Sequence, residues 1–282
     1  PGNGSSELIS LLIETRAPKR TLILGPTYSE YSRELSFSGS TQDYYHLQEA
    51  EDFELDVEDL CRTLLNGYDF LILCNPNNPT SSAILKDEMR ALLSFCANRD
   101  IFVMIDETYV EFAPSVQEVT AVPYTKEFSN LMVLRGVSKF YAAPGMRFGY
   151  GITGNKEFLS QMKEKQIPWS LNSLGAYAGE QMFKDTSYIR QTRALILTER
   201  DRMFLELKKM SSFKVYFPYG NFILVKILKP EVTSFDVFEA CIKEGLMIRD
   251  CSSFQCLDGE FIRFCIMKPE DNNRLLKVLK TI

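Results

Sequence analysis

The chain contains very little histidine, since His46 is the single one among 282 residues. A metal site built on a pair of histidines is therefore excluded. Any catalytic triad that needs a histidine would have to use this one residue. We assign no functional role to His46, and we expect no metal site.

The sequence also lacks long apolar segments and an excess of positive charge. Its longest apolar runs, such as residues 70–74, have five residues, whereas a membrane-spanning helix needs about 20. The net charge is −5 and the isoelectric point is about 5.2, which disfavours a nucleic-acid partner. We therefore expect a protein that contacts neither membranes nor nucleic acids.

The seven cysteines form no C-x-x-C pair, and their number is odd. Most lie in apolar runs, where a cysteine behaves as a small hydrophobic residue. We predict seven reduced thiols and a cytoplasmic location, because disulfides are rare in reducing compartments. The chain begins at Pro1 without the pattern of a signal peptide, and we interpret it as a piece of a longer protein.

Short apolar runs alternate with amphipathic helical segments in the first part of the chain. We predict strands at residues 21–24, 70–74, 101–105 and 131–135, with helices that include 29–37 and 86–99. Continuous apolar runs of this length are typical of strands that are buried on both faces of a parallel sheet. The pattern predicts a doubly wound α/β domain with a mostly parallel sheet over residues 1–170.

The pattern changes beyond Tyr150. Helices are predicted at residues 155–165, 174–183, 188–210 and 234–244, and a last one from Pro269; strands are predicted at 213–217, 222–227, 247–249 and 261–266. We predict a smaller C-terminal α+β domain over residues 171–282, which covers the ligand crevice of the first domain. Trp169 is expected to pack at the junction of the two domains.

Polar and aromatic clusters follow the ends of four predicted strands. They are Gly25-Pro26-Thr27-Tyr28, Asn75-Pro76-Asn77-Asn78-Pro79-Thr80, Asp106-Glu107-Thr108-Tyr109 and Gly136-Val137-Ser138-Lys139. Open parallel sheets bind ligands beyond the carboxyl ends of their strands. The four clusters are therefore predicted to meet at one crevice.

Without histidine, the reactive candidates at this crevice are Lys139, Asp106, Tyr28, Tyr109 and the asparagines. A lysine nucleophile suggests a Schiff base, and an aspartate that faces a pyridine nitrogen suggests pyridoxal 5'-phosphate. A free lysine has a pKa of about 10.4, so it needs a nearby cation or desolvation to act as an amine. Arg147 could supply such a charge and could also hold a phosphate.

Three of these motifs, 75–80, 106–109 and Ser138-Lys139-x7-Arg147, resemble the aspartate-aminotransferase-like superfamily of fold type I enzymes that use pyridoxal phosphate. Residues 2–7 (Gly-Asn-Gly-Ser-Ser-Glu) resemble its phosphate loop, and the match covers nearly the whole chain in order. The resemblance implies a large domain of the PLP-dependent transferase type and a homodimer. Family members usually begin several dozen residues earlier, with a segment that packs against the small domain.

The resemblance also implies a role for each matching residue. Lys139 would form the Schiff base and carry the proton at the substrate Cα, and Asp106 would pair with the pyridinium nitrogen. Tyr109 and Asn78 would bond to the phenolic oxygen of the cofactor, while Tyr28 would stack on its ring. The residues implied for the cofactor phosphate are Gly4, Ser5, Ser6, Ser138 and Arg147. Related enzymes often have a hydroxyl residue in place of Gly136. We therefore expect the contact between that hydroxyl and the cofactor phosphate to be lost or replaced.

Two relatives in this superfamily compete, histidinol-phosphate aminotransferase and L-threonine-O-3-phosphate decarboxylase of cobalamin biosynthesis. Residues 139–145, 168–172, 248–254 and 269–272 resemble the decarboxylase more. Arg249 and Arg263 resemble the arginines that hold the anionic groups of the substrate, with Asn78 beside them. We predict decarboxylation of a phosphorylated amino acid, with threonine phosphate giving aminopropanol phosphate as the leading candidate.

Two alternatives stay open at this stage. The first is transamination of histidinol phosphate or an aromatic amino acid with 2-oxoglutarate. It stays open because the substrate Cα bond that lies perpendicular to the cofactor plane is the one that breaks, and the sequence does not show which bond that is. The second is a non-catalytic module that senses the cofactor. The acidic charge and the intact Lys139, Asp106 and Arg147 disfavour this second alternative.

Overall fold

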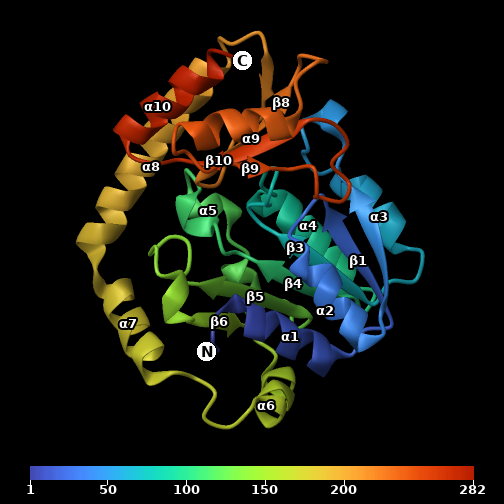
Figure 1. Ribbon diagram of the computed structural model, residues 1–282. Coiled ribbons are helices and arrows are strands. Elements are labelled where there is room, and N and C mark those ends of the chain that lie inside the picture. The colour runs from blue at the N-terminus through green and yellow to red at the C-terminus, as the bar shows by residue number, and fades with distance from the viewer.

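The computed structural model describes residues 1–282 and contains two separate sheets (Figure 1). The larger sheet has the strand order β2-β1-β3-β4-β5-β6. Its strands are β1 (Arg20–Gly25), β2 (Thr41–His46), β3 (Phe70–Cys74), β4 (Phe102–Asp106), β5 (Leu131–Gly136) and β6 (Gly149–Ile152). Strands β1 to β5 are parallel, and β6 pairs antiparallel with β5 at the edge. The prediction of a mostly parallel sheet is confirmed.

Helices cover both faces of this sheet because its inner strands are apolar on both faces. One face packs against α1 (Ser5–Arg16), α2 (Glu30–Ser38) and α6 (Lys156–Lys165), and the other against α3 (Val57–Leu64) and α4 (Lys86–Ala97). Alternate residues of a strand enter different cores. In β3, Ile72 packs in the first core, whereas Leu71 and Leu73 pack in the second. This two-sided burial accounts for the unbroken apolar runs in the sequence.

The smaller sheet is antiparallel, with the order β7-β8-β10-β9. Its strands are β7 (Phe213–Val215), β8 (Phe222–Ile227), β9 (Arg249–Asp250) and β10 (Phe261–Cys265), and the helices beside it are α9 (Ser234–Lys243) and α10 (Pro269–Leu279). Ile223 and Val225 of β8 pack in the core of this part, while Leu224 packs in a core shared with the larger sheet. The two parts are therefore joined through apolar side chains.

Two helices, α7 (Ser173–Lys184) and α8 (Thr186–Leu207), connect the larger sheet to the smaller one. Helix α8 runs along one side of the molecule towards the small sheet (Figure 1). The boundary at residues 170/171 falls between α6 and α7 and stays a prediction. The expectation for Trp169 is wrong, because this residue is 99% exposed in that connection and packs on nothing.

Short elements and loops complete the chain, namely η1 (Glu49–Glu51), η2 (Val110–Phe112), α5 (Val116–Val119), η3 (Val122–Lys126) and η4 (Pro144–Met146). Strand β9 begins two residues later than predicted, because only Arg249 and Asp250 pair with β10. All seven cysteines are free thiols. No helix is both long enough and apolar enough to cross a bilayer.

The strand order determines where a ligand can enter. Strand β2 lies on one side of β1, and β3 to β5 lie on the other. The connections that leave β1 and β3 therefore diverge, and such a reversal opens a crevice beyond the carboxyl ends of the strands. The four clusters singled out in the sequence all lie at these carboxyl ends.

Candidate active site

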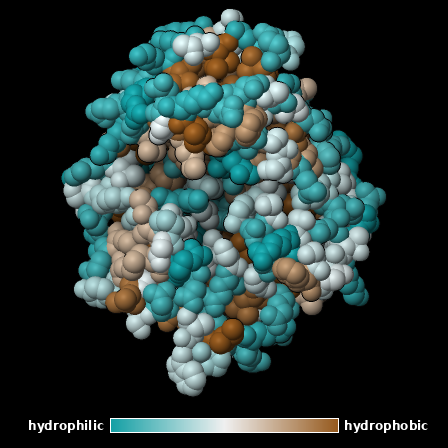
Figure 2. Space-filling model, viewed as in Figure 1, coloured by the Kyte–Doolittle hydropathy of each residue, from teal (hydrophilic) through white to brown (hydrophobic).

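A cavity of about 760 Å³ lies at this crevice, between the carboxyl ends of the large sheet and the small sheet. On the face shown in Figure 2, the surface is hollowed between these two parts. The predicted site residues that line the cavity are Ser5, Ser6, Tyr28, Asn78, Asp106, Tyr109, Ser138, Lys139, Arg147, Arg249 and Arg263. Gly4 does not line the cavity and lies behind it, against Arg147.

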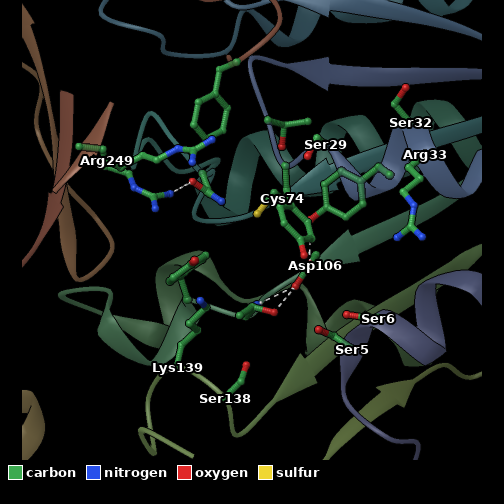
Figure 3. Close-up of a pocket in the computed structure, with 18 of the residues that line it drawn as sticks. Ser5, Ser6, Ser29, Ser32, Arg33, Cys74, Asp106, Ser138, Lys139 and Arg249 are labelled. Atoms are coloured by element: carbon green, nitrogen blue, oxygen red, sulfur yellow. Dashed lines mark hydrogen bonds between the residues drawn. The ribbon is translucent and has the colours of Figure 1, made fainter. Parts of the chain in front are cut away.

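Asp106 ends β4 inside the cavity and is only 4% exposed (Figure 3). Its Oδ1 accepts hydrogen bonds from the backbone N–H of Thr108 (2.9 Å) and the hydroxyl of Thr108 (2.5 Å), and its Oδ2 accepts one from the Tyr31 hydroxyl (2.8 Å). Burial raises the pKa of the Asp106 carboxyl, and these hydrogen bonds, with a smaller effect of the Lys139 charge, oppose that shift. No lysine or arginine forms an ion pair with it.

The neighbouring carboxylate, Glu107, differs from Asp106 in that it makes an ion pair, although burial raises its pKa as well. It points to the opposite side of the chain, where Nε and Nη2 of Arg135 lie 3.0 and 2.8 Å from its Oε2. Thr120 and the backbone N–H of Ala121 also donate to it. Adjacent residues at one strand end thus have different functions, since Glu107 stabilises the loops and Asp106 leaves a buried charge open to the cavity.

Lys139 lies across the cavity from the strand that carries Asp106 (Figure 3). It follows β5 by three residues, and its Nζ lies 5.9 Å from the centre of the Tyr109 ring. The Tyr109 ring is buried and packs edge-on against Phe222 of β8, with centroids 4.9 Å apart. Burial raises the pKa of the Tyr109 phenol, so this group is a hydrogen-bond donor at neutral pH.

Asn78 is brought to the cavity by a turn that other asparagines hold in place. Asn75 binds the backbone of Ile84 (2.8 and 3.0 Å), and Asn77 donates to the carbonyl of Pro26 (2.8 Å). The Asn78 Oδ1 accepts a hydrogen bond from Nη1 of Arg263 on β10. The asparagine-rich motif therefore has two structural members and one member that faces the ligand space.

The first turn of α1 forms one end of the cavity together with Arg147. No side chain caps this helix, so the N–H groups of Ser5 and Ser6 remain free for an anion. Gly4 has a φ of +85°, and a Cβ there would lie 2.5 Å from Nη2 of Arg147. Glycine lets the arginine approach the helix this closely, so a permanent positive charge lies beside the free N–H groups.

Gly136 borders the same end of the cavity. A Cβ at this position would lie 4.0 Å from the backbone nitrogen of Ser5 and 3.3 Å from the carbonyl of Phe148. A hydroxyl side chain would thus point towards this end of the cavity, and glycine supplies none. Ser138 lines the cavity nearby and offers a hydroxyl there.

Arg249 stands on the side of the cavity opposite Ser5 and Ser6 (Figure 3), and Arg263 lines the same cavity. Nη2 of Arg249 donates to the hydroxyl of Ser253 (2.8 Å), and its guanidinium lies over the Phe254 ring. The Nε of Arg263 is buried without a partner. The cavity therefore has cations at both ends and can hold two separate anions.

Two site residues were missed from the sequence. Tyr31, which binds Asp106, reaches it through the packing of α2, and no local pattern indicates this contact. Thr108 binds Asp106 through a turn over two residues, a pattern that aspartate often forms and that could have been recognised. Tyr28, by contrast, lies at the cavity as predicted, and its ring packs edge-on against that of Tyr31.

Comparisons with known proteins show the family of this chain. Residues 1–279 match the family model of aminotransferase class I and II. The chain is 35% identical, over 99% of itself and 75% of the relative, to a Caldanaerobacter subterraneus protein provisionally named threonine-phosphate decarboxylase. It is 30% identical to the threonine-phosphate decarboxylase of Salmonella typhimurium, over all of this chain and 76% of that one. A crystal structure of histidinol-phosphate aminotransferase from Clostridium acetobutylicum matches with a TM-score of 0.92 at 34% identity, covering 99% of this chain and 82% of that one.

The uncompensated charge of Asp106 can be tested in the cofactor-free protein. A carboxyl whose pKa is raised by folding destabilises the folded state as the pH rises above its unfolded value of about 3.9. Asp106→Asn should therefore unfold at a higher temperature than the wild type at pH 8. The difference should shrink as the pH falls towards 4, and each unit of pKa difference corresponds to about 1.4 kcal/mol in the free energy of unfolding.

Glu107→Gln is the matched control for this thermal-unfolding series. It removes the anion that pairs with Arg135 and should lower the unfolding temperature at pH 8. If Asp106→Asn were instead less stable than the wild type at pH 8, the charge would already be balanced within the protein.

Proposed function

Because the chain belongs to the aminotransferase class I and II family, we propose that it decarboxylates a phosphorylated amino acid, with L-threonine O-3-phosphate as the substrate and aminopropanol phosphate as the product. It is an enzyme that uses pyridoxal 5'-phosphate, like its family. The observation that carries the proposal is a single cavity that holds Lys139, the uncompensated Asp106, and arginines at both ends.

The residues present fit the cofactor. The uncapped start of α1 and Arg147 would hold its phosphate, and the buried Asp106 carboxylate would accept a hydrogen bond from a protonated ring nitrogen. The Tyr28 ring would lie against the cofactor ring, and the Tyr109 hydroxyl and Asn78 amide would donate to the ring oxygen. Lys139 would carry the cofactor covalently through its ε-nitrogen.

When bound, pyridoxal phosphate supplies an electron sink for the negative charge that develops at the substrate Cα. Asp106 keeps the proton on the ring nitrogen, because removing it would leave the buried carboxylate without a positive partner. The ε-amine of Lys139 would hold or deliver a proton at the substrate Cα. Arg263 of the small sheet and Ser253, Phe254 and Gln255 of the loop after β9 line the same space.

The substrate would be held by the two arginines of the small sheet. Arg263 lies beside Asn78, next to the expected position of the cofactor ring, and it would bind the carboxylate of the substrate. Arg249 is more exposed and further along the cavity, and it suits the phosphate of the substrate. Both contacts use the planar, permanently charged guanidinium, which orients such anions better than an ammonium group.

The orientation of the carboxylate decides between the two candidate reactions. If Arg263 holds the carboxylate perpendicular to the cofactor plane, CO2 leaves; if the Cα–H bond takes that direction, transamination begins. The aminotransferase alternative is favoured by the close match to the Clostridium acetobutylicum structure. The decarboxylase is favoured by the relative at 35% identity, whereas at 30% identity the chain matches relatives of both names. We further place the reaction in cobalamin biosynthesis and in the cytoplasm.

The function is tested by incubating the protein, loaded with pyridoxal phosphate, with threonine phosphate. We expect stoichiometric release of CO2 and formation of aminopropanol phosphate, because the cavity offers one arginine for the carboxylate of the substrate and another for its phosphate. Histidinol phosphate with 2-oxoglutarate should give no more than about 1% of that rate, which is about 2.7 kcal/mol in the activation free energy.

Lys139→Ala is the control in this assay and should release no CO2 and retain no cofactor after borohydride reduction. Arg274→Ala, at an exposed position of α10, should act like the wild type. Formation of glutamate from 2-oxoglutarate without CO2 would overturn the decarboxylase assignment and support the aminotransferase.

We propose in addition that the enzyme is a homodimer formed through α7 and the connection before it. Several large apolar residues are exposed there, including Trp169 (99%), Leu174 (78%) and Tyr177 (66%). A cluster of this kind on a protein surface is typical of an interaction site.

Analytical ultracentrifugation should find a particle of twice the 32.3 kDa chain mass. Combining Trp169→Glu with Leu174→Glu should convert it to a monomer, because charges would be buried at the contact. A wild-type monomer at micromolar concentration would contradict the dimer.

A further inference from the structure

One buried cation lies outside the cavity, in the middle of α8. Arg200 is only 1% exposed, and the sole carboxylate near it is that of Asp201, which is itself exposed and 3.6 Å from Nε. Burial lowers the pKa of the Arg200 guanidinium. A buried charge of this kind costs several kcal/mol, and an apolar side chain of similar volume could fill the space at a lower cost. The contacts that Arg200 makes must therefore explain why it is there.

Arg200 binds two loops at once. Its Nη1 donates to the carbonyl of Phe112 (3.0 Å) in the segment after β4, and to those of Tyr219 (3.1 Å) and Gly220 (3.3 Å) in the segment before β8. All three acceptors are backbone carbonyls. The guanidinium therefore fixes main-chain positions, and it connects the large sheet to the small one.

The first of these loops carries Tyr109. The 3-10 helix η2 begins directly after Tyr109, and the N–H of Phe112 donates to the Tyr109 carbonyl (3.1 Å). Arg193, two turns earlier on α8, donates to the carbonyls of Glu111, Ala113 and Pro114. The two arginines together hold the carbonyls of four consecutive residues, 111–114, against α8.

The second loop leads to Asn78. The N–H of Tyr219 donates to the Ser81 carbonyl, and the N–H of Gly220 donates to the Ser81 hydroxyl, both at 2.8 Å. Ser81 is held at a φ of +62°, and its own N–H donates to the carbonyl of Asn77 (2.8 Å). A continuous chain of hydrogen bonds thus runs from Arg200 to the turn that presents Asn78.

We propose that Arg200 is a positioning residue that sets the relative placement of Tyr109 and Asn78 at the cofactor ring. The inference rests on the proposed roles of these two residues as donors to the ring oxygen. The two loops that Arg200 contacts, at Phe112 and at Tyr219, lie more than 100 residues apart in the sequence, so without the shared donor each would sample its own conformations. Displacing a positioned group by about 1 Å can cost about 100-fold in rate.

The test uses the holoenzyme with Arg200→Met, Arg200→Lys and a control, Arg190→Met, which alters an exposed arginine on the same helix. The principal measurement is the pH midpoint of the visible absorbance band of the bound cofactor, which needs no substrate. Donors to the ring oxygen stabilise its negative charge and so weaken proton binding beside it. Arg200→Met should therefore raise this midpoint by about one pH unit. It should also lower kcat by about 10-fold while KM changes by less than about 2-fold.

A merely structural role gives a different result. In that case Arg200→Met, if it folds, would keep the wild-type midpoint and kcat, whatever its unfolding temperature, and the proposal would be overturned. If Arg200→Met does not fold, Arg200→Lys decides by the same two readouts, since it keeps the charge but not the planar guanidinium. An equal shift in Arg190→Met would also overturn it. Because the midpoint is measured without substrate, failure of the decarboxylase assignment leaves this test intact.

Discussion

The arrangement depends on one buried carboxylate that makes no ion pair within the protein, that of Asp106. Asp106 has three hydrogen bonds but no ion pair, while Glu107, the next residue, has Arg135 against it. Burial makes the charge of Asp106 unfavourable in the protein alone. A cofactor with a protonated ring nitrogen would remove this penalty. The folded chain thus pre-forms the half of an ion pair that a pyridoxal phosphate enzyme requires.

The parallel sheet supplies the rest of the site by geometry. Its strands end side by side, so that Tyr28, Asn78, Asp106 and Lys139 meet although they are far apart in the sequence. The start of α1 and Arg147 form one end of the cavity, and the small sheet contributes Arg249 and Arg263 to its lining. Helix α8 then ties the loops of both sheets together through main-chain carbonyls.

Much of this could be predicted from the sequence, because strands that are buried on both faces give continuous apolar runs. β3 and β8 match the predicted ranges, and each of the four clusters beyond the strand ends contributes residues to the lining of the cavity. Contacts that depend on tertiary packing could not be predicted, such as Tyr31 on Asp106 or Arg200 on three carbonyls. In a helix, a buried arginine gives the same local pattern as an exposed one. The choice between CO2 loss and transamination depends on small differences in orientation, which residue types do not encode.

The central claim is that the Asp106 carboxylate keeps a proton on the cofactor ring nitrogen. The most direct measurement is the 15N chemical shift of pyridoxal phosphate labelled at that nitrogen and bound to the protein between pH 6 and 9. The account predicts a protonated nitrogen throughout this range in the wild type and an unprotonated one in Asp106→Asn. An unprotonated ring nitrogen in the wild type at pH 7 would contradict it.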